Sequence, residues 1–219
     1  MPTTAQTFES HSPADGRVIA TYPIMDADAV REAVDRGRIA ASWWVSLGFD
    51  ERKARLLRFK ALVAKRSKEL AELVHAENGK PMDDALLEII LSVEHINWAA
   101  LNARSVLKRR GVRPGLLTIN QAAHVRYQAL GVVGVIGPWN YPVFTPIGSI
   151  AYALAAGNAI VFKPSEFTPA VGEWLIDAIN EVIPEQPVAQ LVTGLGATGA
   201  ALCEAGVDKI SFTGSTPTG

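Results

Sequence analysis

Apolar residues recur every three or four positions through most of the first 107 residues, which is the period of a helix with one buried face. Asp26 precedes the first stripe and is a suitable N-cap. A second stretch begins near Asp50. The apolar positions of the two stretches are Val30, Ala33, Val34, Gly37, Ala41 and Trp44, then Leu56, Phe59, Val63, Leu70, Leu73 and Val74. We therefore expect the first half of the chain to be helical.

The charged positions of the second stretch carry both signs and predict a solvated outer face, to which we assign no function. They are Glu51, Arg52, Lys53, Arg55, Arg58 and Lys60. This stretch should end near Gly79, which can adopt the left-handed conformation, and Pro81, which cannot continue a helix. We expect a third helix from Met82 to about Leu107.

Beyond residue 110 the pattern changes. Residues 111–128 suit a polar-faced β-hairpin with strands at 116–119 and 124–127. Short apolar runs then alternate with helical stretches, the runs at 132–136, 159–162, 188–192 and 209–212, and the helices at 146–156, 170–183 and 197–205. This alternation is typical of a parallel sheet covered on both faces. We predict an α/β fold with a doubly wound, Rossmann-like parallel sheet.

Three parts follow from these patterns. Residues 1–108 form an N-terminal helical part, residues 109–129 a protruding hairpin, and residues 130–219 a Rossmann-like core.

Composition then excludes several classes of function. The net charge of −1 argues against sequence-independent binding of nucleic acid. The single cysteine, Cys203, excludes a small fold that is held together by internal disulfides.

No apolar run is long enough to span a bilayer, and the first ten residues show no signal peptide. We therefore expect a cytoplasmic protein without a membrane partner. We also predict no metal site, because the histidines show no ligand spacing. They are His11, His75, His95 and His124.

Ligands of doubly wound sheets bind beyond the carboxyl ends of the strands, so the four strand exits are the candidate site. The third exit, residues 194–199, matches G-x-G-x-x-G, which is equally compatible with tight packing and with a pyrophosphate cradle. The second exit offers the cation of Lys163 and the carboxylate of Glu166, which suit either ribose hydroxyls or an exposed ion pair.

Several segments together resemble the NAD(P)+-dependent aldehyde dehydrogenase superfamily. They read GVVGVIGPWNYP at 131–142, ALAAGNAIVFKPSEFTP at 153–169 and ISFTGSTPTG at 210–219, and ENGKP at 77–81 resembles the family's E-x-G-K-P helix end. The resemblance covers essentially the whole chain. It implies an enzyme that oxidises an aldehyde to a carboxylic acid, and this chain would supply the cofactor-binding part.

The resemblance also assigns site residues. Asn140 falls on the family's oxyanion-hole asparagine, and Lys163 and Glu166 fall on the pair that binds the adenosine ribose. The remaining cofactor-binding positions are Ile136, Pro138, Trp139, Ser165, Gly196, Phe212, Gly214 and Ser215. A glutamate at position 166 would repel a 2′-phosphate, so we favour NAD, with NADP possible.

The resemblance makes residues 111–128 an oligomerisation hairpin, although a loose surface hairpin is an alternative. We therefore expect a homo-oligomer or association with a longer dehydrogenase chain. The family's catalytic cysteine and glutamate lie downstream of F-T-G-S, and we interpret Cys203 as inert packing rather than the nucleophile. Tyr141 and Phe144 hint at an apolar or aromatic aldehyde.

Family members are more than twice this long, so three hypotheses remain. The chain is the cofactor-binding portion of a dehydrogenase, a non-catalytic nucleotide-binding or regulatory module, or an interaction subunit of a longer relative. The first is favoured, because Asn140 and Glu166 keep the family's chemistry. We expect the isolated chain to bind NAD weakly, because the helix that opens at Ser215 is barely begun. We also expect poor solubility from an open sheet edge.

Overall fold

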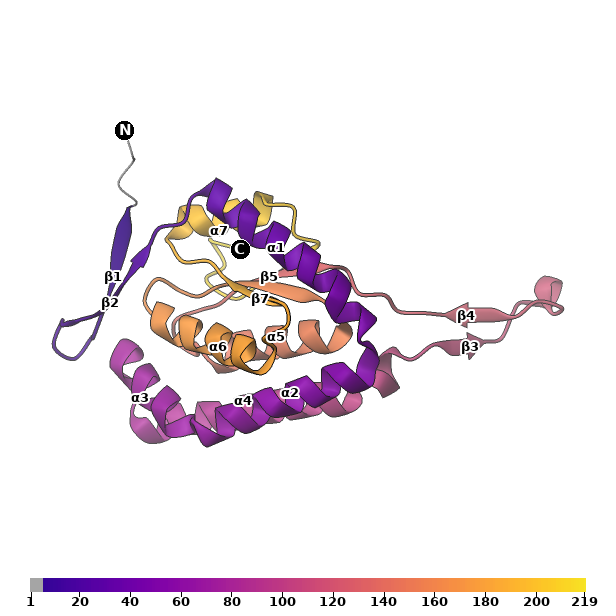
Figure 1. Cartoon of the computed structure of the whole chain (residues 1–219), viewed down its shortest axis with the longest axis horizontal. Helices are drawn as coiled ribbons and strands as arrows, with labels where there is room; N and C mark the ends of the chain where they lie inside the picture. The colour runs from indigo at the N-terminus through magenta and orange to yellow at the C-terminus, as the bar shows by residue number, and fades with distance from the viewer. Residues whose placement is uncertain (1–5) are drawn as a thin grey trace.

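The computed structural model describes residues 6–219. A parallel sheet lies at its centre (Figure 1). The sheet has four strands in the order β7-β6-β5-β8. The strands are β5 (Val132–Ile136), β6 (Ala159–Lys163), β7 (Ala189–Leu191) and β8 (Lys209–Phe212). They are joined by the helices α5 (Phe144–Ala156), α6 (Pro169–Val182) and α7 (Gly196–Glu204). The predicted α/β fold is confirmed, and each strand lies where the apolar runs placed it, to within one residue.

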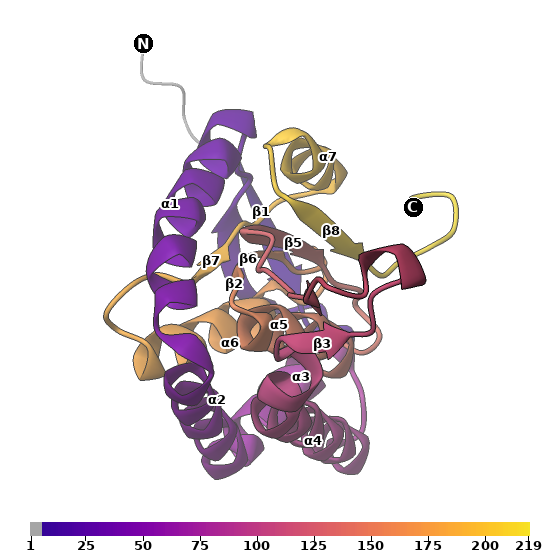
Figure 2. The ribbon, with the colours of Figure 1, turned by 90° about the vertical axis from the view of Figure 1, so that its right-hand side faces the viewer.

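Helices cover both faces of the sheet. On one face α1 (Ala27–Ser46) and α7 enclose a small core, to which alternate strand residues Val132 and Val161 point. On the other face α5 and α6 pack against Val133, Ile160 and Phe162. Figure 2 shows these layers with α1 and α7 above the sheet and α5 and α6 below it. Because successive residues of a strand face opposite ways, fully apolar strands are what two covered faces require.

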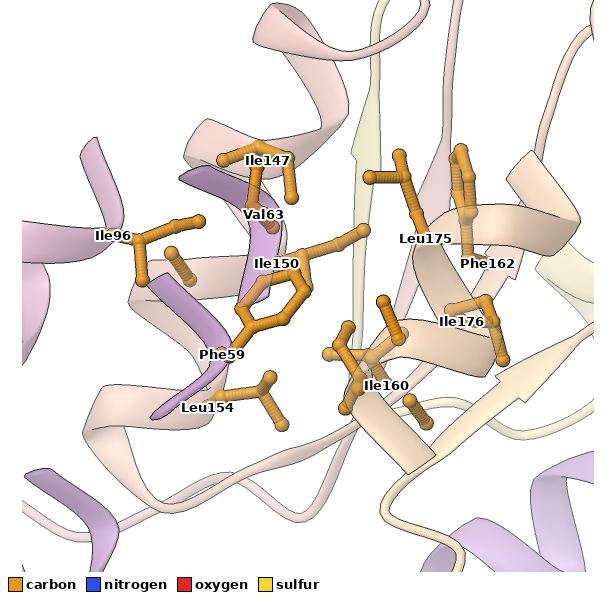
Figure 3. Packing of buried hydrophobic residues seen from close by; sticks show 14 of the residues in the cluster. Phe59, Val63, Ile96, Ile147, Ile150, Leu154, Ile160, Phe162, Leu175 and Ile176 are labelled. Carbon is orange, nitrogen blue, oxygen red and sulfur yellow. The ribbon is translucent and has the colours of Figure 1, made fainter. Parts of the chain in front are cut away.

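A third layer of helices lies outside α5 and α6. It consists of α2 (Gly48–Lys65), α3 (Ser67–Asn78) and α4 (Met82–Leu107). Phe59 and Val63 from α2 and Ile96 from α4 reach the main core, where Figure 3 shows them beside side chains of α5. No helix within residues 6–219 is long and apolar enough to cross a membrane.

The first helix begins and packs as predicted. The Asp26 carboxylate accepts a hydrogen bond from the N–H of Ala29, and all six stripe residues are buried. The end of α3 and both ends of α4 also match, with Gly79 at a φ of 76°. The expected single stretch from about Asp50 to the stop at Gly79 is wrong, because Arg66 separates α2 from α3. Both helices pack against α6.

Arg52 corrects the prediction of a uniformly solvated face on the second stretch. Its side chain is buried. The guanidinium donates hydrogen bonds to the carbonyl oxygens of Trp44, Val45 and Ala155, at distances of 3.5, 3.2 and 3.4 Å. These carbonyls lie in the last turns of α1 and α5, where helix dipoles favour a positive charge. Arg52 therefore joins two helix ends inside the protein.

The hairpin protrudes far from the body, as Figure 1 shows, but its strands differ from the prediction. β3 (Arg110–Val112) pairs antiparallel with β4 (Ala123–Val125). The expected strand at 116–119 is wrong, since Leu116–Thr118 is a single 3₁₀ turn at the tip. Hydrogen bonds from Thr118 N–H to Gly115 and from Gln121 N–H to Thr118 close that turn, so these residues have no strand partner.

A second hairpin was not predicted at all. β1 (Thr7–His11) pairs antiparallel with β2 (Val18–Pro23). Its hydroxyl groups tie it to the helical layers, with Ser10 Oγ at 2.6 Å from a carboxylate oxygen of Glu77 and Tyr22 OH at 2.9 Å from one of Glu173. The expectation of an entirely helical first half is therefore wrong for this segment.

Candidate functional site

Strand register brings the strand exits together. Ile136 pairs with Lys163 on one side and with Phe212 on the other. Beyond the strands, the N–H of Gly137 donates to the carbonyl of Lys163, and the N–H of Thr213 donates to the carbonyl of Ile136, both at 3.0 Å. Three exit loops are thereby aligned side by side at the carboxyl end of the sheet, while the long hairpin leads into the amino end of β5.

A cavity of about 740 Å³ opens at this edge. All eleven site residues named from the sequence line it. They are Ile136, Pro138, Trp139, Asn140, Lys163, Ser165, Glu166, Gly196, Phe212, Gly214 and Ser215. Their common position follows from the sheet, because parallel strands end at one edge. What they bind remains a proposal.

Asn140 follows β5 and presents a hydrogen-bond donor. Its Oδ1 accepts a hydrogen bond from the N–H of Tyr141 at 3.1 Å, which fixes the orientation of the amide. The side chain is exposed, and within residues 6–219 no hydrogen bond from its Nδ2 is formed. The NH₂ group is thus free to donate to an oxygen atom that carries developing negative charge.

Lys163 brings a buried cation to the cavity wall. Only 4% of the residue is exposed, and its Nζ donates to the carbonyl of Pro164 at 3.0 Å. Burial lowers the pKa of Lys163, whereas the nearby Glu166 carboxylate opposes that effect. An ammonium has three donors, so Lys163 can also donate to a ligand in the cavity. Ser165 Oγ lies 3.4 Å from a carboxylate oxygen of Glu166.

The G-x-G-x-x-G segment divides into a packing glycine and two cavity glycines. Gly194 has a φ of 149°, and a Cβ there would lie 2.1 Å from Thr198 Oγ1, so its role is close packing. Gly196 and Gly199 line the cavity, and a Cβ on Gly196 would meet no atom within 4 Å. The backbone at the start of α7 is therefore open to a ligand.

Cys203 corrects the expectation of inert packing. It is exposed and lines the cavity. The helical period could have predicted this, because Gly196, Gly199 and Cys203 lie on one face of α7. Gly137 and Thr213, at the predicted strand exits, also line the cavity, and the cavity residues that sequence reasoning missed are Phe167, Ala200 and Thr218. Within residues 6–219 no group of three metal-ligating side chains occurs.

Comparisons with known proteins identify the family. A model of the aldehyde dehydrogenase family matches residues 1–219. The chain belongs to this family. An N-succinylglutamate 5-semialdehyde dehydrogenase from Paraburkholderia xenovorans is 36% identical over 219 residues, which cover 99% of this chain and 44% of the relative. The chain thus spans less than half the length of such relatives.

Solved structures of the family share the fold closely. The NAD+ complex of an aldehyde dehydrogenase from Bacillus cereus is 30% identical, with a TM-score of 0.90 over 98% of this chain and 44% of that one. The NADP complex of an NADP-dependent glyceraldehyde-3-phosphate dehydrogenase from Bacillus halodurans is 28% identical, with a TM-score of 0.90 over 97% of this chain and 46% of that one.

Proposed function

We propose that this chain is the cofactor-binding portion of an NAD(P)+-dependent aldehyde dehydrogenase, which oxidises an aldehyde to a carboxylic acid. The observation that carries the proposal is that one cavity at the carboxyl edge of the sheet brings three groups together. It gathers a free amide donor on Asn140, a buried cation on Lys163 and open backbone at Gly196. Family membership supports this interpretation of the cavity.

The cavity residues fit a nicotinamide dinucleotide. The Lys163 ammonium and the Glu166 carboxylate can hold ribose hydroxyls as donor and acceptor. The open backbone at Gly196 lets a phosphate approach the first turn of α7, where free N–H groups favour an anion. When bound, the cofactor accepts a hydride. Glu166 disfavours a 2′-phosphate, so we favour NAD+ over NADP+.

Asn140 would act on the aldehyde itself. Attack by a nucleophile places negative charge on the aldehyde oxygen, and a fixed donor there is worth roughly 3–4 kcal/mol of transition-state stabilisation. We assign the nucleophile to the part of the family that this chain does not span. Cys203 lies on α7 among the residues that would hold the cofactor, which is the wrong place for attack on the aldehyde.

The protruding hairpin supports association with another chain. Its tip exposes Leu116, Leu117 and Ile119 by 87%, 98% and 73%. Exposed apolar side chains at the end of a projecting ribbon are typical of an association surface. We propose that the hairpin joins copies of this protein or a longer relative. Sedimentation of the protein with Leu116→Ser and Leu117→Ser should then show a smaller assembly than the unchanged protein.

The one cysteine offers a direct test of the cofactor site. Bound NAD+ should slow alkylation of Cys203 by N-ethylmaleimide, because both occupy one cavity. Lys163→Met should weaken this protection, whereas Lys209→Met, a change outside the cavity lining, should not. If millimolar NAD+ and NADP+ leave the alkylation rate unchanged, and calorimetry detects no binding of either, the proposed cofactor site is wrong.

A further inference from the structure

The loop that carries Asn140 is held from outside the sheet by the turn between α3 and α4. Asn78 Nδ2 donates a hydrogen bond of 2.6 Å to the carbonyl oxygen of Trp139. Lys80 Nζ donates one of 2.9 Å to the carbonyl oxygen of Asn140. Two consecutive carbonyls are therefore fixed by side chains that lie about 60 positions earlier in the chain.

The turn itself is shaped for this contact. Gly79 adopts a φ of 76°, and a Cβ there would lie 2.9 Å from Pro13 Cγ, so a larger residue would be strained both in its backbone and by this contact. The ring Nδ1 of His75 lies 2.7 Å from the carbonyl oxygen of Lys80. Asn78 and Lys80 thus project from a rigid turn.

Lys80 is balanced by a buried carboxylate. Its Nζ forms an ion pair with Glu88 Oε2 and lies 4.2 Å from the centre of the Tyr141 ring. The Lys80 and Glu88 side chains are 12% and 0% exposed. Glu88 Oε1 accepts hydrogen bonds from the N–H groups of Val143 and Phe144, at 2.8 and 2.9 Å. A buried carboxylate needs such partners, because desolvation of an unpaired charge is costly.

These contacts fix the backbone on both sides of Asn140. The carbonyls of residues 139 and 140 are bound by Asn78 and Lys80, and the N–H groups of residues 143 and 144 are bound by Glu88. The remaining freedom of the side chain is limited by the bond from Tyr141 N–H to its Oδ1. These contacts therefore limit the directions in which the Nδ2 donor can point.

We propose that Asn78, Lys80 and Glu88 are positioning residues that aim the Asn140 amide at the aldehyde oxygen. The inference rests on the proposed function, in which Asn140 donates to that oxygen. A catalytic donor must be held within about 0.5 Å of its productive position by a supporting shell. The end of α3, the turn after it and the start of α4 supply that shell, and neither Lys80 nor Glu88 lines the cofactor cavity.

Nuclear magnetic resonance of the Asn140 side-chain amide tests this directly. The chain has seven asparagines, so selective ¹⁵N-asparagine labelling gives a small set of amide signals, and loss of one signal in Asn140→Ser assigns Asn140. The double variant Lys80→Met with Glu88→Gln removes the ion pair without leaving a charge buried. We expect its Asn140 amide signal to shift, while the circular dichroism spectrum stays unchanged.

Lys60→Met is the matched control. Lys60 Nζ donates to Asn97 Oδ1 at 3.1 Å, so its loss should move the Asn97 signal and leave Asn140 unchanged. If the double variant does not fold, Asn78→Ala removes only the bond to Trp139 and should move Asn140 in the same direction to a smaller extent. Lys80→Arg keeps the charge and should retain most of the unchanged protein's Asn140 signal.

An Asn140 signal that stays the same in the folded double variant and in Asn78→Ala would overturn the positioning role. Addition of NAD+ to the same labelled samples separates this result from the proposed function. If NAD+ moves no signal while the variants still move Asn140, the cofactor assignment fails and the positioning contacts stand.

Discussion

The indole Nε1 of Trp44 donates a 2.8 Å hydrogen bond to the carbonyl oxygen of Leu154 in the buried core. This bond joins α1 to the last turn of α5. Trp44→Phe should destabilise the protein by about 1–3 kcal/mol, because it removes a buried hydrogen bond and packed surface, while the Leu154 carbonyl keeps the hydrogen bond from the N–H of Gly157. Urea unfolding measures the change. Trp98→Phe, at a position that is 51% exposed, should cost less. Equal losses for the two variants would contradict the importance of the bond.

A second helix-end contact gives a sharper contrast. Arg52→Met should destabilise the protein by roughly 2–3 kcal/mol, since the buried hydrogen bonds to Trp44 and Ala155 and the partly buried one to Val45 would all lose their charged donor. The neighbouring Lys53 is exposed, so Lys53→Met should change the free energy of unfolding by less than about 0.5 kcal/mol. Similar urea midpoints for both variants would show that Arg52 is dispensable.

The contrast between residues 52 and 53 also shows the limit of sequence reasoning. Continuous apolar runs located the sheet strands, because such runs reflect burial on both faces, and Gly79 with Pro81 located the start of α4. The sequence pattern did not predict that Arg52 is buried. A charged residue among other charged residues gives no sign that it will donate hydrogen bonds to the carbonyls at two helix ends. That information lies in the packing of α1 and α5 against α2.

Long-range contacts explain the other failures. The β1–β2 hairpin is short, and its attachment depends on Glu77 and Glu173, which are far away in the chain. The tip at Leu116 has strand-like composition but no partner strand. In contrast, all eleven site residues named from the sequence line one cavity. They do so because a parallel sheet brings its strand exits to one edge, whatever residues the loops contain. Their roles stay predictions.

The pH dependence of stability should carry a signature of Glu69. Hydrogen bonds from Arg66 and from Trp174 Nε1 lower the pKa of Glu69 from 4.5 to about 2. A carboxyl whose pKa is lowered by folding stabilises the native state above pH 4.5 and loses that contribution as the pH falls towards 2. Glu69→Gln should therefore be less stable than the unchanged protein at pH 6, and the difference should shrink by pH 3.

The side chain of Glu69 is 51% exposed, so solvent screening should keep the difference below about 1 kcal/mol. Urea unfolding at pH 3, 4 and 6 measures it. Glu72→Gln is the control, because the Glu72 carboxylate forms only an exposed ion pair with Lys68 at 3.8 Å. A pH-independent difference for Glu69→Gln would contradict the assigned shift.

Glu166 should set the choice between the two dinucleotides. Its carboxylate lines the cavity beside the buried Lys163, where it can accept bonds from ribose hydroxyls and repel a 2′-phosphate. Glu166→Ser should weaken NAD+ binding. It should raise the affinity for NADP+ relative to the affinity for NAD+ by about tenfold, which corresponds to about 1.4 kcal/mol. Competitive titration of both dinucleotides at low salt, where charge effects are least screened, measures the ratio of the two affinities.

Glu204→Ser is the control. It removes one exposed carboxylate at the end of α7, outside the cavity lining, and should leave the ratio unchanged. A ratio that moves equally in both variants would attribute discrimination to net charge, and a ratio that moves in neither would remove Glu166 from the recognition of the ribose.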